Sequence, residues 1–171
     1  MEVAQAQAGF ATTRCRYQDQ DTPQTLREGL AEYRAANPAL FDPEALQQQG
    51  ELGDLGRFFA GHDACHVLFG LSTSLADESL ADTWTFFGTD VRWRELYSYF
   101  RSDAQKQFFK DFLGEIGYWT LISASLRALP RVLRAIWRTR KMTRKWSLHG
   151  WAEHLDEPLC ELRTRYGIAI V

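Results

Sequence analysis

Four residues in the middle of the chain carry side chains that bind divalent metal ions, at a spacing that can bring them together. They are His62, Asp63, His66 and Glu78, in the pattern H-D-x-x-H-x11-E. On a helix, His62 and His66 lie one turn apart and Asp63 falls within an arc of roughly 100° with them. Imidazoles combined with carboxylates suit Zn²⁺, Fe²⁺ or Mn²⁺, so we expect one divalent ion, with zinc as the first choice.

Glu78 joins this set if the chain turns back on itself. Gly70 can end the first helix, and Ser74 can cap the next, with Asp77 as its capping-box acid. Glu78 then lies in the first turn of an antiparallel neighbour. Three protein ligands would leave a position for water or substrate, as in catalytic sites. Asp63 and Glu78 are also the candidate catalytic residues, since whichever does not bind the metal can transfer a proton.

The alternative interpretation is a pair of hydrogen-bonded core histidines, because His-x-x-x-His by itself is common on apolar helices. The surrounding helix, expected over 55–71, is apolar nearly all round and should be buried. Ionisable groups in such a helix are costly unless they are paired or bind a metal. Burial therefore favours a metal. Cys65 points elsewhere on this helix and is not needed as a ligand, although its thiolate could serve as one.

Two hydrolase classes with related motifs fit less well. HD-type phosphohydrolases need a histidine upstream of the His-Asp pair, and none precedes His62. A zincin protease has glutamate in the second position of its motif, where this chain has Asp63.

The elements that must position these residues are helices, because alternating β-branched strand patterns are nearly absent. Thr22-Pro23 can open the first helix, with Leu26, Leu30 and Tyr33 facing inward and an end before Pro38. Gly167 suits the C-cap of the last. Further helices are expected from Pro43 and over 55–71, 75–87, 102–126, 130–145 and 158–166. The sequence predicts an all-α fold, a single-domain helical bundle (22–171) with a buried metal-binding helix hairpin, behind a poorly ordered N-terminal segment (1–21).

Length and composition limit the class of protein. At 171 residues and 45% hydrophobic content the chain can bury one core. Three widely spaced cysteines form no disulfide framework, which indicates a reducing, cytoplasmic compartment. Residues 1–16 lack the apolar core of a signal peptide. The longest uncharged apolar-leaning run, 116–126, is far shorter than the roughly 20 residues that span a bilayer.

Charge is distributed unevenly along the chain. Eight basic and no acidic residues lie in 127–145, whereas the rest has 12 basic and 22 acidic residues. One helical face there carries Arg127, Arg131, Arg134, Arg138, Lys141 and Lys145, and the other carries Leu129, Val132, Leu133, Ile136 and Trp137. Such a helix is typical of a peripheral membrane contact through anionic lipid. A core-packed helix with a solvated basic face is the alternative. Nucleic acid is disfavoured, because no binding motif is present and the net charge is −2.

The sequence resembles the coenzyme Q (ubiquinone) biosynthesis protein Coq-four family, whose signature is the same H-D-x-x-H-x11-E. The resemblance covers about 52–168 and is strongest over 62–78. The family's Leu-Leu-Gly-Met-Pro-Thr is similar to Leu68-Phe69-Gly70-Leu71-Ser72-Thr73, with Ser72 in place of the proline. Trp84 with Phe86 and the run from Leu159 to Ile168 also resemble family features. The pattern is that of a divergent bacterial-type member.

This resemblance implies an α-helical, metal-dependent protein of ubiquinone biosynthesis at the inner face of the cell membrane. Its substrate would be a polyprenylated hydroxybenzoate, decarboxylated at ring carbon 1, with an oxidative, hydroxylating variant as the alternative. The enzyme would be a lyase. A non-catalytic isoprenoid-lipid-binding or scaffold protein of a quinone biosynthesis complex is the second possibility. Other quinone-biosynthesis enzymes and a second copy of the chain are the partners left open.

Several further residues could contribute to the site. Aromatic side chains flank the motif and could line a pocket for a prenyl chain or ring, although most are expected in the core: Phe58, Phe59, Phe69, Trp84, Phe86 and Phe87. Glu115 is a candidate extra polar group. His149 and His154 are expected at the surface or in C-terminal packing rather than as ligands.

Overall fold

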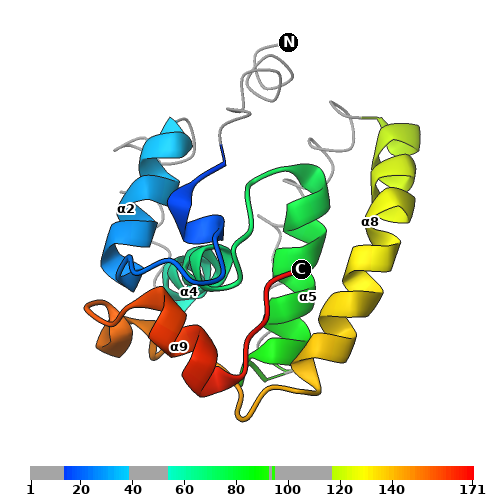
Figure 1. Ribbon diagram of the computed structural model, residues 1–171. Helices are drawn as coiled ribbons and strands as arrows, with labels where there is room; N and C mark the ends of the chain where they lie inside the picture. The colour runs from blue at the N-terminus through cyan, green and yellow to red at the C-terminus, as the bar shows by residue number, and fades with distance from the viewer. Residues whose placement is uncertain (1–13, 39–53, 93, 95–116) are drawn as a thin grey trace.

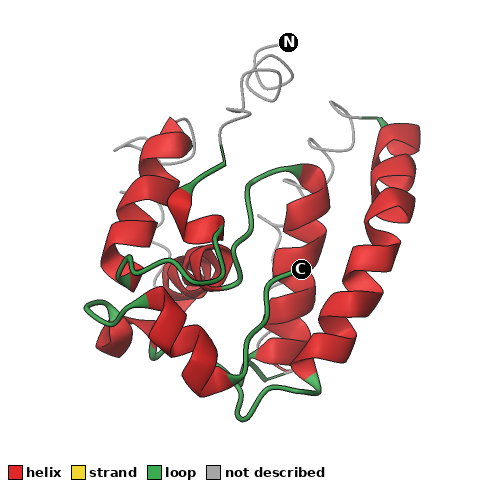
Figure 2. Ribbon diagram, viewed as in Figure 1, coloured by secondary structure: helices red, strands yellow, loops and turns green. Residues whose placement is uncertain are grey.

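The protein is an all-α bundle (Figures 1 and 2). The computed structural model describes residues 14–38, 54–92, 94 and 117–171. Within these ranges there is no strand, only two isolated backbone bridges. The helices are η1 (Arg16–Gln18), α2 (Leu26–Ala36), α4 (Asp54–Leu68), α5 (Leu75–Gly88), α8 (Tyr118–Thr139), η3 (Trp151–His154) and α9 (Leu159–Tyr166). None of the described helices has the length and apolarity needed to cross a membrane.

Helix α2 begins three residues later than the sequence predicts. Thr25 caps it and forms a capping box with Glu28, so the expected start at Thr22-Pro23 is wrong. The reason is long-range, because residues 22–26 run extended beside residues 157–160 and pair with them through backbone hydrogen bonds. The expected inward side chains are confirmed, since Leu26, Leu30 and Tyr33 are all buried.

The segment before α2 is packed against the core from Cys15 onward. Tyr17 in η1 is 1% exposed, and its hydroxyl donates to the carbonyl of Leu71. The poorly ordered segment expected over 1–21 therefore does not include 14–21, and 1–13 lie outside the described residues. The short helix expected from Pro43 also lies outside them.

Helices α4 and α5 form the predicted hairpin at the centre of the fold. Helix α4 ends at Leu68, three residues before its expected end, because Gly70 follows with φ +69°, a left-handed conformation that favours glycine. The Ser74 side chain caps α5 as predicted by accepting from the Asp77 backbone N–H. The Asp77 carboxylate is not a capping-box acid, however, because it accepts from Ser72 instead.

Helix α8 runs beside α5 in the same direction (Figure 1). Arg131 meets Asp77 near the start of α5, and Met142 lies beside Gly88 at its end. The helix passes through Pro130, so the break expected there is wrong, and it ends at Thr139 rather than Lys145. Pro130 is exposed. An interior proline costs a helix about 3 kcal/mol, and the packing of α8 against α5 offsets this cost. Residues 102–116 of the expected preceding helix are not described.

The inward face of α8 differs from the apolar face that the sequence predicts. Small side chains, Ala128, Ala135 and Thr139, are buried against the bundle. Leu129, Leu133 and Trp137 are each about half exposed, and Val132 and Ile136 are partly buried. Arg131 is also not on an open basic face, because it pairs with Asp77. Small residues allow α8 to approach α5 closely, which turns the large apolar side chains outward.

Helix α9 closes the bundle beneath α4 (Figure 1). Pro158 precedes it, and Gly167 ends it in the left-handed conformation, as predicted. Arg163 of this helix is fully buried and donates hydrogen bonds to five backbone carbonyls, those of Tyr17, Asp19, Gln20, Val67 and Leu68. It joins η1 and the loop after it to the C-terminal end of α4, the helix that carries both histidines.

Candidate metal centre

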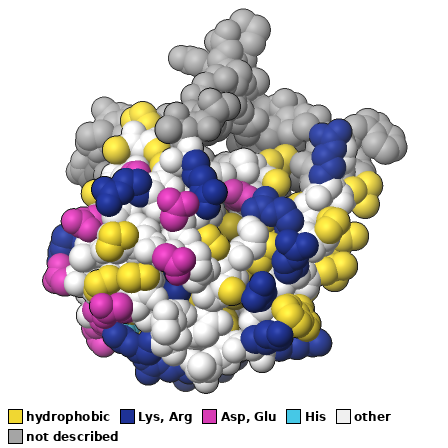
Figure 3. Space-filling view, in the orientation of Figure 1, with side chains coloured by type: hydrophobic (Ala, Val, Ile, Leu, Met, Phe, Trp, Pro, Cys, Tyr) yellow, Lys and Arg dark blue, Asp and Glu magenta, His cyan; other side chains and the backbone are white. Residues whose placement is uncertain are grey.

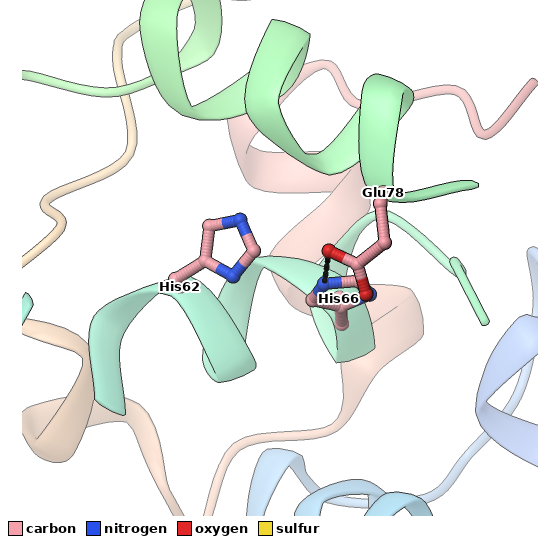
Figure 4. Close-up of side chains that lie close together, drawn as sticks. All are labelled: His62, His66 and Glu78. Atoms are coloured by element: carbon pink, nitrogen blue, oxygen red, sulfur yellow. Dashed lines mark ion pairs between the residues drawn. The ribbon is translucent and has the colours of Figure 1, made fainter. Parts of the chain in front are cut away.

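Two imidazoles and one carboxylate converge between α4 and α5 (Figure 4). One ligand atom each of His62, His66 and Glu78 lies within 4.8 Å of the other two. The Nε2 atom of His66 is 3.4 Å from Oε2 of Glu78. The two histidine rings have centroids 4.9 Å apart and are steeply inclined to each other. This set of donors, two nitrogens and an oxygen, fits a borderline divalent cation such as Zn²⁺.

The helix register produces this convergence. His62 and His66 are one turn apart on α4, and Glu78 lies in the first turn of α5, just after its cap. The two helices meet in opposite order, since His66 faces Glu78 and His62 faces Asp82 one turn further on, with Nε2 and Oδ1 3.5 Å apart. Asp82 was not among the residues predicted from the sequence, although its spacing of four from Glu78 places it on the same face.

The orientation of His66 is set by a backbone carbonyl. Its Nδ1 lies 3.1 Å from the oxygen of Ser72. A carbonyl can only accept, so Nδ1 carries a proton, and Nε2, which faces Glu78, is the nitrogen available to a cation. The ring is 1% exposed and stacks on Tyr33 with centroids 5.3 Å apart. Tyr33 was predicted as a core residue of α2, and its place beside the ligands was not foreseen.

The electrostatics of His66 and Glu78 are coupled. Burial alone lowers the pKa of His66, but the hydrogen bond and charge of Glu78, with the charge of Asp63, raise it above its ordinary value. Burial alone raises the pKa of Glu78, but the hydrogen bond and charge of His66, together with His62, bring it below its ordinary value. Without a cation each group thus favours the charged form of the other, the imidazolium of His66 and the carboxylate of Glu78.

Asp63 lies near the cluster but outside the group of three converging atoms. Burial raises the pKa of its carboxyl to about 6, against the opposing effects of His66, His62 and Arg34. The structure thus brings three of the four predicted ligands together. Metal binding by Asp63 stays a prediction.

The other candidates are placed away from the converging atoms. Cys65 is fully buried in the core, and burial raises the pKa of its thiol to about 12, so it stays protonated. His154 pairs with Glu157 at 2.6 Å in the C-terminal region, in agreement with its expected packing role, and His149 is exposed. Glu115 lies outside the described residues.

Most of the flanking aromatic side chains belong to the core, as expected. Phe69 and Trp84 are fully buried and stack on each other with centroids 4.3 Å apart. Phe58 is also buried but has its ring beside His62, with centroids 6.5 Å apart, and Phe87 is 40% exposed. Phe58 therefore borders the cluster through the ring of His62.

Fold and cluster together define an all-α protein with a candidate divalent-metal centre of two histidines and a glutamate. Comparison of the chain with protein-family models, curated proteins and solved structures gave no match. The relation to the Coq-four family therefore stays a hypothesis that rests on the motif at residues 62–78.

Proposed function

We propose that the protein binds one divalent metal ion through His62, His66 and Glu78 and decarboxylates a polyprenylated hydroxybenzoate at ring carbon 1, a step of ubiquinone biosynthesis. The observation that carries the metal site is the convergence of the three ligand atoms within 4.8 Å. The alternative is a pair of core histidines whose polar partners are Glu78 and Asp82, and metal analysis of the purified protein distinguishes the two. The choice of substrate rests on the resemblance of the motif.

The proposed reaction is a non-oxidative decarboxylation. The bond between ring carbon 1 and its carboxylate breaks, carbon dioxide leaves, and the electron pair stays with the ring until that carbon takes up one proton. A bound divalent cation supplies Lewis-acid stabilisation of negative charge on the oxygens of such a substrate. No electron acceptor is required, in contrast to the oxidative, hydroxylating variant.

The chain's own residues divide the remaining tasks. His62, His66 and Glu78 hold the cation, and the carbonyl of Ser72 keeps the Nε2 of His66 directed at it. Asp63 is the carboxyl left to deliver the proton to ring carbon 1, because it neighbours both imidazoles without belonging to the converging set. Tyr33 packs against the face of His66 and shields it from water.

The test is carbon dioxide release from a carboxyl-labelled polyprenyl-hydroxybenzoate by purified protein loaded with Zn²⁺, Fe²⁺ or Mn²⁺ in turn. Release with one of these ions, lost on chelation and restored on reloading, would support the proposal. A hydrogen-bearing product at ring carbon 1 identifies the non-oxidative route, and a hydroxylated product the oxidative one. Absence of release with every ion would overturn the catalytic proposal.

A second candidate function, isoprenoid-lipid binding without catalysis, is favoured by the outer surface of α8. Leu126, Leu129, Leu133 and Trp137 recur at helical spacing and are 47–65% exposed. Figure 3 shows hydrophobic side chains along this edge, with Lys and Arg side chains beside them. We infer that this surface, the α8 stripe, contacts the anionic inner face of the cell membrane. Tight binding of a prenylated ligand without carbon dioxide release would favour a carrier or a scaffold for other quinone-biosynthesis enzymes.

A further inference from the structure

The ring of His66 is oriented by a loop residue that is itself held from outside the cluster. Ser72 accepts from Nδ1 of His66 through its carbonyl oxygen. One carboxylate oxygen, Oδ2 of Asp77, accepts from the backbone N–H of Ser72 at 2.9 Å and from its hydroxyl at 2.6 Å, and the longer contacts of that hydroxyl, 3.2 and 3.3 Å, are with Ser74. Asp77 therefore determines where the carbonyl that faces His66 stands.

Asp77 is in turn held by helix α8. It is 7% exposed, and its second oxygen, Oδ1, accepts from NH1 of Arg131 at 2.7 Å. Arg131 also donates from NH2 to the backbone oxygen of Val171 at 3.1 Å, so two contacts fix the plane of its guanidinium. An almost buried carboxylate needs such a cation, because an uncompensated charge there would be costly.

We propose that Asp77 and Arg131 are positioning residues of the metal centre, which hold Ser72 so that His66 presents its Nε2 to the ion; this inference rests on the proposed metal binding by His62, His66 and Glu78. Neither residue belongs to the H-D-x-x-H-x11-E motif. The path runs from Arg131 through Asp77 and Ser72 to His66, and each step is a hydrogen bond of 2.6–3.1 Å.

A carboxylate suits this position because three groups donate to Asp77: the guanidinium of Arg131 and the backbone N–H and hydroxyl of Ser72. Asp77→Asn keeps the size but places an amide NH₂ against either Arg131 or the N–H and hydroxyl of Ser72. One of the two contacts must then be lost. Arg131→Gln removes the positive charge that faces Asp77. Because the side chain of Arg131 is 40% exposed, the substitution should leave the packing of the core unchanged. Arg131→Lys keeps the charge and should restore part of the effect.

The experiment measures zinc affinity of the full chain by competition with a chromophoric chelator, and records the absorption spectrum of the Co²⁺-loaded protein. Orientation partners of ligating histidines typically contribute 10–100-fold to metal affinity. We expect Asp77→Asn to weaken zinc binding at least about tenfold and to alter the Co²⁺ spectrum, Arg131→Gln to act in the same direction, and Arg131→Lys to recover affinity. Arg140→Gln, which removes an exposed charge at the end of the same helix, is the matched control and should bind like the native chain.

The outcomes separate this inference from the proposed function. If the native chain itself binds no Zn²⁺ or Co²⁺, the metal site is refuted and the inference falls with it. If the native chain binds and all variants match its affinity and spectrum, the site stands and the positioning role is wrong. A purely structural role would lower the melting temperature of the metal-free protein without moving the affinity, so melting is measured beside it. Should Asp77→Asn not fold, the Arg131 series decides.

Discussion

The buried imidazole of His66 meets a carboxylate that can either neutralise it or share a cation with it. Both groups gain their charged forms from each other, since the pKa of His66 is raised and that of Glu78 is lowered against the effect of burial. Removing Glu78 would take away a carboxylate partner of the buried His66 ring, whereas Glu78, with a side chain 39% exposed, can still reach water when His66 is removed. A divalent ion held by Nε2 of His66 and the carboxylate of Glu78 would take the place of this ion pair, and metal analysis distinguishes the two states.

Replacing Glu78 by glutamine should abolish metal binding. The amide keeps the shape of the side chain but lacks the negative charge that offsets a divalent ion. We expect the metal content, measured by inductively coupled plasma mass spectrometry, to fall from near-stoichiometric to below about a tenth. Glu161→Gln on the exposed face of α9 is the control and should keep its metal. Full metal content in Glu78→Gln would mean that Glu78 is not a ligand.

Asp63→Asn should separate catalysis from metal binding. If Asp63 delivers the proton, the variant keeps its ion but loses carbon dioxide release by a factor of about 10² or more. Metal content and release are measured on the same preparation, beside Asp156→Asn, which alters a surface ion pair with Arg27. Loss of the metal in Asp63→Asn would instead identify Asp63 as a ligand, and an unchanged rate would exclude it as the proton donor.

At the scale of the elements, α9 holds α4 through one side chain. Arg163 is fully buried, and burial lowers the pKa of its guanidinium to about 10. Its acceptors are neutral backbone carbonyls, and two of them, those of Val67 and Leu68, belong to the C-terminal turn of α4. The backbone N–H of Gly70 also donates to Val67, so Arg163 adds to the donors that satisfy this helix end.

Arg163→Met should destabilise the protein strongly. The substitution leaves several buried carbonyls without a donor, at a cost of about 1–3 kcal/mol each where water cannot reach, so we expect a loss of at least about 3 kcal/mol in the free energy of unfolding. Chemical denaturation followed by circular dichroism measures it. Arg165→Met on the same helix removes an exposed ion pair with Glu157 and should change the free energy of unfolding far less. Equal effects of both substitutions would contradict the role of Arg163.

Local sequence signals predicted the helix ends correctly where no distant segment of the chain competes for the same residues. Ser74 and Gly167 mark real helix ends, because capping and left-handed glycine are properties of a few consecutive residues. Thr22-Pro23 carries an equally good start signal, yet those residues pair with 157–160 instead. Pro130 carries a break signal that packing on α5 overrides. Such competition depends on distant segments and is not visible in local patterns.

The candidate site was predictable from the sequence only as far as its three converging side chains. His62, His66 and Glu78 follow from helix spacing and one tight turn. The groups that orient and cover them come from elsewhere in the fold: Tyr33 from α2 and Arg131 from α8. Arg131 was assigned to an exposed basic face because periodicity gives the face of a residue but not the element that will pack there.

On the scale of the whole molecule, the α8 stripe is the large apolar surface that the described bundle leaves uncovered, and basic side chains flank it (Figure 3). Burying a leucine in a membrane interface is worth roughly 1.5–3 kcal/mol, so Leu133→Asp should lower partitioning onto vesicles at least about tenfold. Co-sedimentation with vesicles containing anionic lipid, beside neutral vesicles, measures this. Ala152→Asp adds the same charge in η3, away from α8, and should partition like the native chain (Figure 1). If the native chain stays in the supernatant with both kinds of vesicle, the stripe does not bind membranes, and a second copy of the chain, detected by light scattering, becomes the occupant to test.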